Sequence, residues 1–225
     1  MSGAAALPWP DIASVFLDMD GTLLDLHFDN HFWLTHVPRR FAEKHALPYE
    51  EARPRVLARY QAVAGTLDWY CVDYWTRELD LDIVRLKEEV AQLIAVHPHV
   101  EEFLARARGA GKRVLLVTNA HHKSVSLKMR MTGIEGHFNA VVSAHDLGTP
   151  KEDPRFWERL RSLEAYDPGR TLLVDDSLPV LRSARDYGIR HLLGVRAPDS
   201  RQPPKAVEEF DSIADFSELL PGQIQ

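Results

Sequence analysis

Short apolar runs recur along the chain and are separated by segments with helical periodicity. The runs are apolar at consecutive positions, which is typical of parallel strands covered on both faces. The expected strands are residues 14–17, 113–117, 140–143, 171–174 and 191–195. The helices expected between them are residues 100–110, 123–131, 154–163 and 178–187, several followed by a glycine in the position of a helix C-cap. This alternation predicts an α/β fold with a doubly wound, Rossmann-like parallel sheet.

The segment from Phe28 to Val96 breaks this alternation. It has charged and aromatic helical patterns and no clear strand, with helices expected at residues 31–45, 50–63, 72–79 and 83–94. The length of 225 residues fits either one domain with a large insertion or two unequal domains. We therefore expect residues 28–96 to form a helical unit inserted after the first strand, and residues 1–27 and 97–225 to form an α/β core.

Composition narrows the class of protein. A chain with 45% hydrophobic and 27% charged residues is neither disordered nor fibrous. The net charge is −6 and the basic residues are scattered, so we expect no nucleic-acid partner. The N-terminus lacks the pattern of a secretory leader, and charges interrupt every apolar stretch before the roughly 18 residues of a membrane helix, so we expect a cytoplasmic protein without membrane contact.

The histidine pairs and the single cysteine give weaker evidence for a functional site. Cys71 has no second cysteine with which to form an internal disulfide, and we expect it to pack as a small hydrophobe. His97 and His99, like His121 and His122, lack a supporting pattern of carboxylates. We expect both histidine pairs to lie in solvated loops rather than at a metal. His121 follows Thr118 closely and could also make a minor contact with the substrate.

Polar side chains end the expected strands. Because ligands gather at the carboxyl ends of parallel strands, we expect these side chains to converge at one edge of the sheet. They are Asp18 and Asp20 after the first strand, Thr118 and Asn119 after the second, Lys151 after the third, and Asp175 and Asp176 after the fourth. Crowded carboxylates repel one another unless a cation neutralises them, and oxygen-only ligands favour Mg²⁺.

This set of side chains predicts a site for a phosphoryl group. A carboxylate such as Asp18 can attack phosphorus and become an aspartyl phosphate. Asp20, turned differently by Gly21, could protonate the leaving oxygen and then activate water. Thr118 and Lys151 would bind the remaining phosphate oxygens. Asp175, Asp176 and Ser177 could also act as an N-cap of the following helix.

The four segments resemble, in order, the four motifs of the haloacid dehalogenase superfamily. They are Asp18-Met-Asp-Gly-Thr-Leu-Leu24, Thr118, Lys151 and Val174-Asp-Asp-Ser177. The resemblance implies that Asp18 is the nucleophile. It also implies that Mg²⁺ is held by the Asp18 side chain, the Asp20 backbone carbonyl and either or both of Asp175 and Asp176, of which Asp176 is the stronger candidate for a metal ligand. It also implies phosphate binding by Thr118, Asn119 and Lys151, and a cap role for the helical unit.

Further segments resemble the bacterial GMP/IMP nucleotidase branch of that superfamily. They are residues 28–33, 66–75, 117–121, 150–153 and 198–200. The resemblance implies that purine nucleoside 5′-monophosphates are the substrates. A sugar-phosphate phosphatase or a phosphomutase is the alternative, and a non-catalytic sensor of a phosphorylated ligand would be expected to lack Asp18 or Asp20. Oligomeric state stays open.

Aromatic residues with near-helical spacing lie in the helical unit. Trp69, Tyr70, Tyr74 and Trp75 could form its core or a wall for a purine base. We expect at least one of them to stack on the base, and we take Trp69, Tyr70 and Tyr74 as the candidates for substrate binding.

Overall fold

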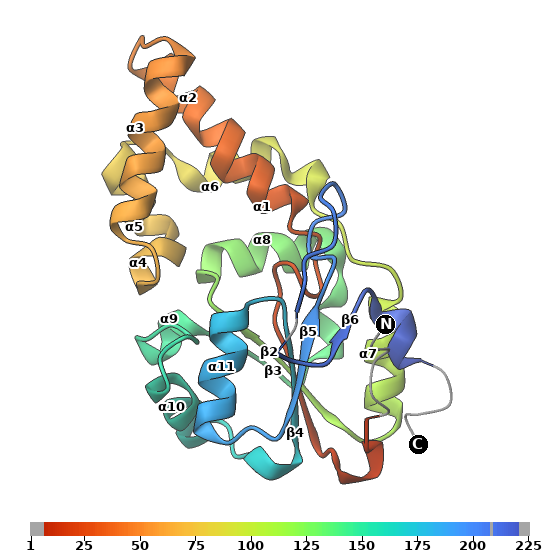
Figure 1. The fold of residues 1–225 in the computed structure, drawn as a ribbon. Helices are drawn as coiled ribbons and strands as arrows, with labels where there is room; N and C mark the ends of the chain where they lie inside the picture. The colour runs from red at the N-terminus through yellow and green to blue at the C-terminus, as the bar shows by residue number, and fades with distance from the viewer. Residues whose placement is uncertain (1–6, 208, 221–225) are drawn as a thin grey trace.

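The fold has a parallel sheet of six strands, with helices on both faces and a helical unit at one end (Figure 1). This computed structural model describes residues 7–207 and 209–220. The strands are β1 (Ser14–Leu17), β2 (Arg113–Thr118), β3 (Ala140–Ser143), β4 (Thr171–Asp175), β5 (His191–Val195) and β6 (Ser212–Ile213), in the order β3-β2-β1-β4-β5-β6. The predicted α/β class and the five predicted strands are confirmed, and β6 is an addition.

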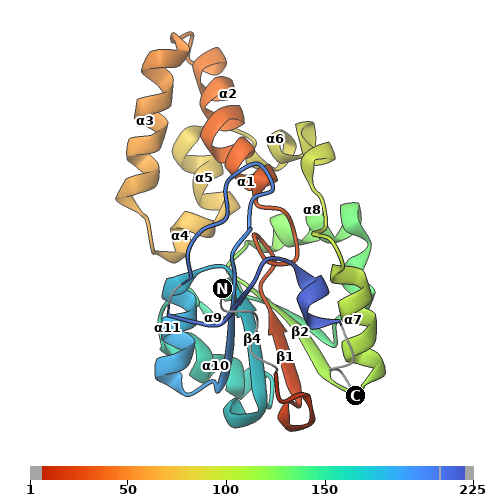
Figure 2. The ribbon, with the colours of Figure 1, turned by 45° about the vertical axis from the view of Figure 1, so that its right-hand side comes forward.

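Alternate side chains of the strands enter two hydrophobic cores, one on each face of the sheet. Val15 and Leu17 of β1 pack with the helices on one face, and Phe16 packs with those on the other. The first face carries α7 (Val100–Gly109) and α8 (His122–Thr132), whereas the second carries α9 (Ala144–Leu147), α10 (Arg155–Leu163) and α11 (Leu178–Tyr187) (Figure 2). Burial on both faces explains why these strands are apolar at consecutive positions.

Glycines end two of these helices as expected. Gly133 follows α8 with φ of 72°, and Gly188 follows α11 with φ of 108°. Glycine adopts this left-handed conformation at lower cost than other residues, so the chain turns out of each helix towards the next strand.

Residues 27–93, which we call the helical insertion, follow β1 and contain no strand. The helices are α1 (His27–His31), α2 (Val37–Lys44), α3 (Tyr49–Ala62), α4 (Leu67–Tyr70), α5 (Val72–Leu79) and α6 (Ile83–Glu89). A π-helical turn, Phe32–His36, joins α1 to α2, and a 3₁₀ turn, Ala91–Leu93, follows α6. The helix predicted at residues 31–45 is therefore a composite, the one predicted at 83–94 ends early, and α4 is an addition.

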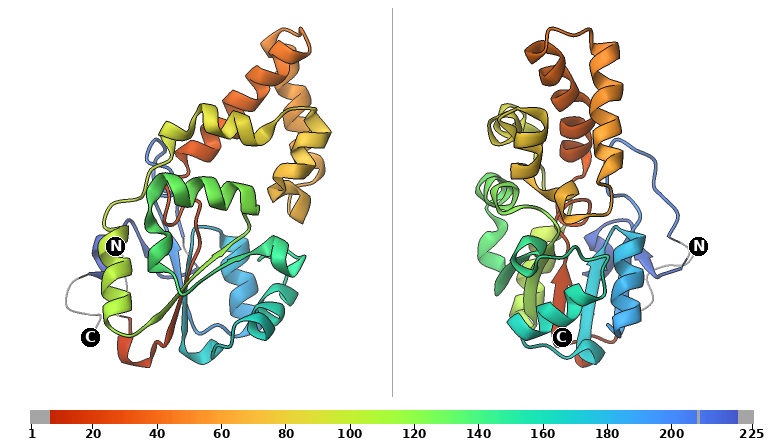
Figure 3. Two further views of the ribbon diagram at one scale, coloured as in Figure 1. Left: turned by 180° about the vertical axis from the view of Figure 1, so that it is seen from behind. Right: turned by 90° about the vertical axis from the view of Figure 1, so that its left-hand side faces the viewer.

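The helical insertion has its own hydrophobic core. Phe28, Phe32, Val56, Trp75 and Ile83 are among its fully buried members. The insertion extends away from the sheet beyond the carboxyl ends of the strands, as the view from behind shows (Figure 3). The strand ends and the insertion therefore face each other. Across residues 7–207 and 209–220, no helix combines the length and the apolar character needed to cross a membrane.

Candidate active site

Two neighbouring strands bring acidic residues together at the point where the strand order reverses. β1 pairs in parallel with β4, with Leu17 opposite Val174, so Asp18 and Asp175 leave the sheet side by side. Carboxylate oxygens of Asp18, Asp175 and Asp176 lie within 4.8 Å of one another. Three clustered carboxylates offer only hard oxygen ligands, and this donor set fits Mg²⁺.

A buried lysine joins two of these carboxylates. Lys151 is 1% exposed, and its Nζ donates hydrogen bonds to Asp18 Oδ1 and, at 2.7 Å, to Asp175 Oδ2. Burial raises the pKa of Asp18 to about 6, although the charge of Lys151 opposes the shift. Burial also raises the pKa of Asp175 and of Asp176. Three carboxylates face two ammonium groups here, because Lys205 Nζ also donates to Asp176 Oδ2 at 2.9 Å, so one negative charge is left for a bound cation.

Gly21 allows the turn after β1 to pass close to Asp176. Its φ is 83°, and a Cβ atom at this position would lie 2.8 Å from Asp176 Cγ. A side chain here would strain the backbone and displace the carboxylate. The glycine thus gives the turn that carries Asp20 past Asp18 and leaves space for Asp176.

The carboxylate of Asp20 belongs to a second charged cluster, which also includes Asp29, Lys87 and Lys128. Lys128 in α8 is 1% exposed, and its Nζ donates at 2.6 Å to Asp20 Oδ1 and at 2.6 Å to Asp29 Oδ2 of α1. Lys87 in α6 lies 3.4 Å from Asp29 Oδ1. Burial and the charge of Asp29 raise the pKa of Asp20 to about 6, against the charge of Lys128. The cluster links the predicted acid/base residue to the helical insertion.

The phosphate-binding candidates of β2 connect to the insertion through another chain of hydrogen bonds. Asn119 Oδ1 accepts from the Lys151 backbone N–H at 2.9 Å, and Asn119 Nδ2 donates to Glu152 Oε2 at 2.9 Å. Tyr70 Oη of α4 donates to Glu152 Oε1 at 2.6 Å. Thr118, which is 1% exposed, accepts at 3.1 Å from the Ala120 N–H. The strand end and the insertion are thus joined at the site.

A pocket of about 300 Å³ lies between the strand ends and the insertion. Its lining includes all the predicted catalytic, phosphate-binding and metal-binding residues, namely Asp18, Asp20, Thr118, Asn119, Lys151, Asp175 and Asp176. The pocket therefore collects in one place side chains that are up to 158 positions apart in the sequence, between Asp18 and Asp176.

One wall of the pocket is aromatic. Trp33, Tyr60, Trp69 and Trp75 line it, and Tyr60 makes edge-on contacts with the other three at ring-centroid distances of 4.8–5.9 Å. Trp75 is 1% exposed, whereas Trp69 is 37% exposed. Tyr70 also lines the pocket. Tyr74 is absent from the lining and packs edge-on against Trp75, so the pocket supports Trp69 and Tyr70 more directly than Tyr74 as substrate-binding candidates.

Other site residues were not identified from the sequence. Lys87 in α6 and Lys128 in α8 are buried lysines, and nothing in their local sequence separates them from solvated lysines. Glu152, next to Lys151, could have been found from its position in the loop between α9 and α10. For Asp175 to Ser177, the capping prediction is wrong in detail, because the Ser177 side chain makes no cap and Asp175 Oδ1 instead accepts from the Ser177 N–H.

Comparisons with known proteins agree with this geometry. The family model of haloacid dehalogenase-like hydrolases matches residues 12–188. GMP/IMP nucleotidase YrfG of Escherichia coli is 38% identical over 96% of this chain and 97% of its own length. A phosphorylated carbohydrates phosphatase of Thermotoga maritima is 24% identical over 89% of this chain and 92% of its own.

Solved structures show the same fold. The crystal structure of an HAD phosphatase from Thermococcus onnurineus has a TM-score of 0.77 at 24% identity, and the match covers 92% of this chain and 96% of that one. The fold, the order of the motifs and the extent of the family match agree, and on these grounds the chain belongs to the haloacid dehalogenase-like hydrolase family.

Proposed function

We propose that the protein is a Mg²⁺-dependent phosphatase that hydrolyses purine nucleoside 5′-monophosphates such as GMP and IMP through an aspartyl phosphate. The observation that carries the proposal is the pocket in which Asp18, Lys151 and the Asp175–Asp176 pair meet, with Asp20 on its wall. The similarity to a GMP/IMP nucleotidase along nearly the whole chain supports the choice of substrate.

In the proposed reaction, an oxygen of Asp18 attacks phosphorus and the bond from phosphorus to the nucleoside oxygen breaks. Asp20 donates a proton to that departing oxygen. Water then attacks the aspartyl phosphate, gives its proton to Asp20, and the P–O bond to Asp18 breaks to release phosphate. Thr118, Asn119 and Lys151 would bind the phosphate oxygens. When held by Asp18, the Asp20 carbonyl, Asp175 and Asp176, Mg²⁺ would neutralise the charge between carboxylates and phosphate.

Replacement of Asp20 tests the acid/base role. Asp20→Asn should slow turnover of a nucleotide by the roughly 10²- to 10⁴-fold that is typical of removing a general acid/base. The amide keeps the size of the side chain and its oxygen can still accept from Lys128, but loss of the charge unbalances the cluster, so a lower melting temperature is expected and the rate is measured where the variant is folded. Steady-state release of phosphate from GMP is the measurement, and a rate equal to that of the unaltered protein would exclude the role.

We further propose that residues 28–96 act as a cap on the core formed by residues 1–27 and 97–225. Two connections support a closed arrangement, the hydrogen bond from Tyr70 to Glu152 and the contact of Lys128 with Asp29. A closed cap would exclude bulk water until the nucleoside leaves, and its aromatic wall would select the leaving group. Trp69 is our candidate for stacking on the base because it lines the pocket and is the most exposed member of the wall.

A substrate panel tests the nucleotide proposal. GMP and IMP should be hydrolysed with higher kcat/KM than pyrimidine nucleotides or hexose phosphates. Comparison of their kcat/KM with that of AMP shows which purine bases the enzyme prefers. Highest turnover on a hexose phosphate would favour the sugar-phosphate phosphatase. Return of phosphate to a sugar without release would favour a phosphomutase.

Substitution of the aromatic wall separates stacking from packing. Trp69→Ala should lower kcat/KM for GMP about tenfold or more relative to p-nitrophenyl phosphate, since a stacked base gains about 1–3 kcal/mol. Trp75→Ala is the matched control, because this buried ring belongs to the core of the insertion and its loss should lower the melting temperature and both activities together. An unchanged ratio in Trp69→Ala would contradict stacking at this residue.

A further inference from the structure

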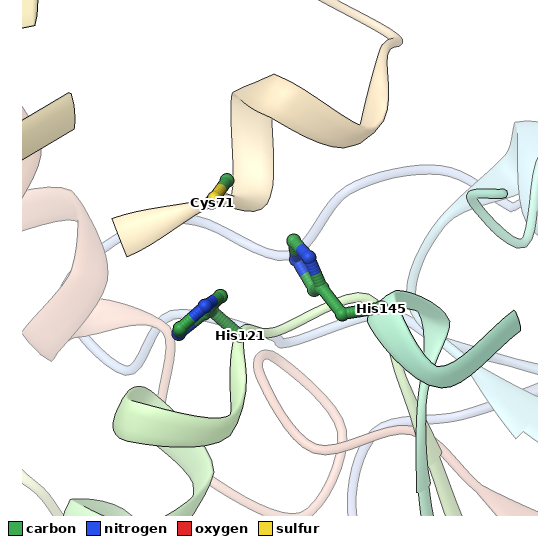
Figure 4. A group of neighbouring side chains, drawn as sticks. All are labelled: Cys71, His121 and His145. Carbon is green, nitrogen blue, oxygen red and sulfur yellow. The ribbon is translucent and has the colours of Figure 1, made fainter. Parts of the chain in front are cut away.

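A group of potential metal ligands lies outside the proposed catalytic centre, where the insertion meets the core. Cys71 is the N-cap of α5 in the insertion, His121 precedes α8, and His145 lies in α9. The Cys71 sulfur and one ring nitrogen from each histidine lie within 4.8 Å of one another. Figure 4 shows the three side chains approaching one another from three separate segments. Cys71 is a free, half-buried cysteine, so its sulfur is accessible in this cluster.

The donor atoms of this group suit a soft or borderline cation. One sulfur and two imidazole nitrogens disfavour Mg²⁺ and favour Zn²⁺, which binds such ligands in tetrahedral geometry. Ligand atoms around zinc lie about 3.3–3.8 Å apart, given its bond lengths to nitrogen and sulfur. The observed spacing reaches up to 4.8 Å, so binding of zinc would require these half-buried side chains to move closer together, with water as the fourth ligand.

The ligand atoms have few competing partners. His145 Nε2 is buried and has no hydrogen-bond partner among the described residues. Cys71 Sγ accepts a long bond, 3.4 Å, from the Tyr74 N–H, and His121 Nδ1 accepts one of 3.3 Å from the Lys123 N–H. Burial lowers the pKa of both histidines, that of His145 to about 4, so the imidazoles are neutral at neutral pH. Neutral rings provide the lone pairs that a metal requires.

The carboxylate of Asp73 lies near the ring of His121, one of the three potential ligands. Asp73 Oδ2 lies 3.7 Å from His121 Nε2, and its other oxygen accepts from Lys123 Nζ. Metal-binding histidines commonly donate a hydrogen bond to such a carboxylate, which orients the ring and increases its basicity, and Asp73 would need to move closer to accept that bond. Asp73 belongs to the insertion and His121 to the core, so the carboxylate contact spans the same boundary as the cluster.

We propose that Cys71, His121 and His145 form a binding site for Zn²⁺ that bridges the helical insertion and the core. On binding, the Cys71 thiol loses a proton to solvent and its sulfur joins the metal, with no change of oxidation state. The ion would hold α5 against α8 and α9. This site is distinct from the proposed Mg²⁺ site in its residues and in its donor atoms.

Spectroscopy with Co²⁺, which replaces Zn²⁺ in such sites, tests the proposal. The full chain, kept reduced and saturated with Mg²⁺, is titrated with Co²⁺. We expect one equivalent to give a sulfur-to-cobalt charge-transfer band and the intense visible bands of four-coordinate cobalt, and Zn²⁺ should abolish both. Cobalt at the carboxylates of the catalytic pocket would give no sulfur band, so the two sites are distinguished.

Variants assign the ligands. Cys71→Ser should lose the charge-transfer band, and His145→Gln should weaken Co²⁺ binding at least about tenfold, as loss of a direct ligand should exceed the typical effect of an outer partner. His122→Gln is the matched control, since this exposed neighbour pairs with Asp146 and should leave the spectrum unchanged. Absence of the sulfur band in the unaltered chain, or unweakened binding in His145→Gln, would overturn the bridging site. Melting temperatures confirm that each variant is folded.

The expected effect on turnover rests on the proposed function. If the insertion must move to release product, Zn²⁺ added with saturating Mg²⁺ should lower kcat in the unaltered protein and not in Cys71→Ser. Equal inhibition of both proteins would contradict a role for the bridge in turnover. The cobalt spectrum needs no catalysis, so it still tests the metal site if the protein hydrolyses none of the nucleotides.

Discussion

Asp18→Asn should abolish phosphate release from every substrate while the protein stays folded. The amide has nearly the volume of the carboxylate, but it cannot act as the anionic nucleophile. It also removes one of the two carboxylates that hold Lys151, so that lysine would keep Asp175 as its charged partner. We expect a loss greater than about 100-fold, since nucleophilic attack has no substitute in the pocket.

Two measurements separate a chemical effect from a structural one. The melting temperature of Asp18→Asn should stay near that of the unaltered protein, and the variant should still bind GMP in an equilibrium assay. Acid quenching of the unaltered enzyme with ³²P-labelled substrate should trap phosphate on the protein, and the variant should trap none. Residual turnover above about a hundredth of the unaltered rate would count against Asp18 as the nucleophile.

Removal of divalent metal should also stop turnover, and Mg²⁺ should restore it. Asp18, Asp175 and Asp176 place three carboxylates together, and Lys151 is already bonded to two of them. A phosphate dianion would add two further negative charges to this group, so it needs a cation beside the carboxylates. Ca²⁺ should inhibit, because its larger and looser coordination shell would misplace Asp18 relative to phosphorus.

The experiment is dialysis against EDTA followed by addition of each metal. Asp176→Asn is an informative companion, because it should raise the Mg²⁺ concentration needed for half-maximal activity, and excess Mg²⁺ should recover part of the rate. Cys71→Ser should respond to EDTA and Mg²⁺ as the unaltered protein does. Full activity after complete chelation would refute the metal requirement.

The sheet could be predicted because its strands are continuous apolar runs that end at polar residues. Asp18 and Asp175 follow such runs directly, so their meeting at one edge follows from the parallel order alone. Strand β6, with two residues, is too short to give a pattern. The helices of the insertion were harder to delimit, since a π-helical turn keeps an apolar face without a break in the sequence.

The surroundings of the site could not be predicted in the same way. Burial of Lys128 depends on carboxylates from α1 and from the turn after β1, which the chain brings together only on folding. The roles of the aromatic wall residues could not be predicted from the sequence either. Trp69 and Trp75 have equivalent local sequence patterns, and their exposure differs only because of how the insertion packs around them. Cys71 and His145 are 74 positions apart, and their proximity follows from the docking of the insertion on the core.

The cluster of Asp20, Asp29, Lys87 and Lys128 constrains which substitutions the protein tolerates. Two carboxylates face two ammonium groups, and both lysines are almost fully buried. Loss of one member leaves an unbalanced charge in a poorly solvated place, which costs more than loss of an oppositely charged pair. Positions 29, 87 and 128 are therefore expected to change together among related sequences, which couples substitutions in the insertion to substitutions in α8. A variant with a neutral residue at position 128 should regain part of its lost stability when position 29 is also made neutral.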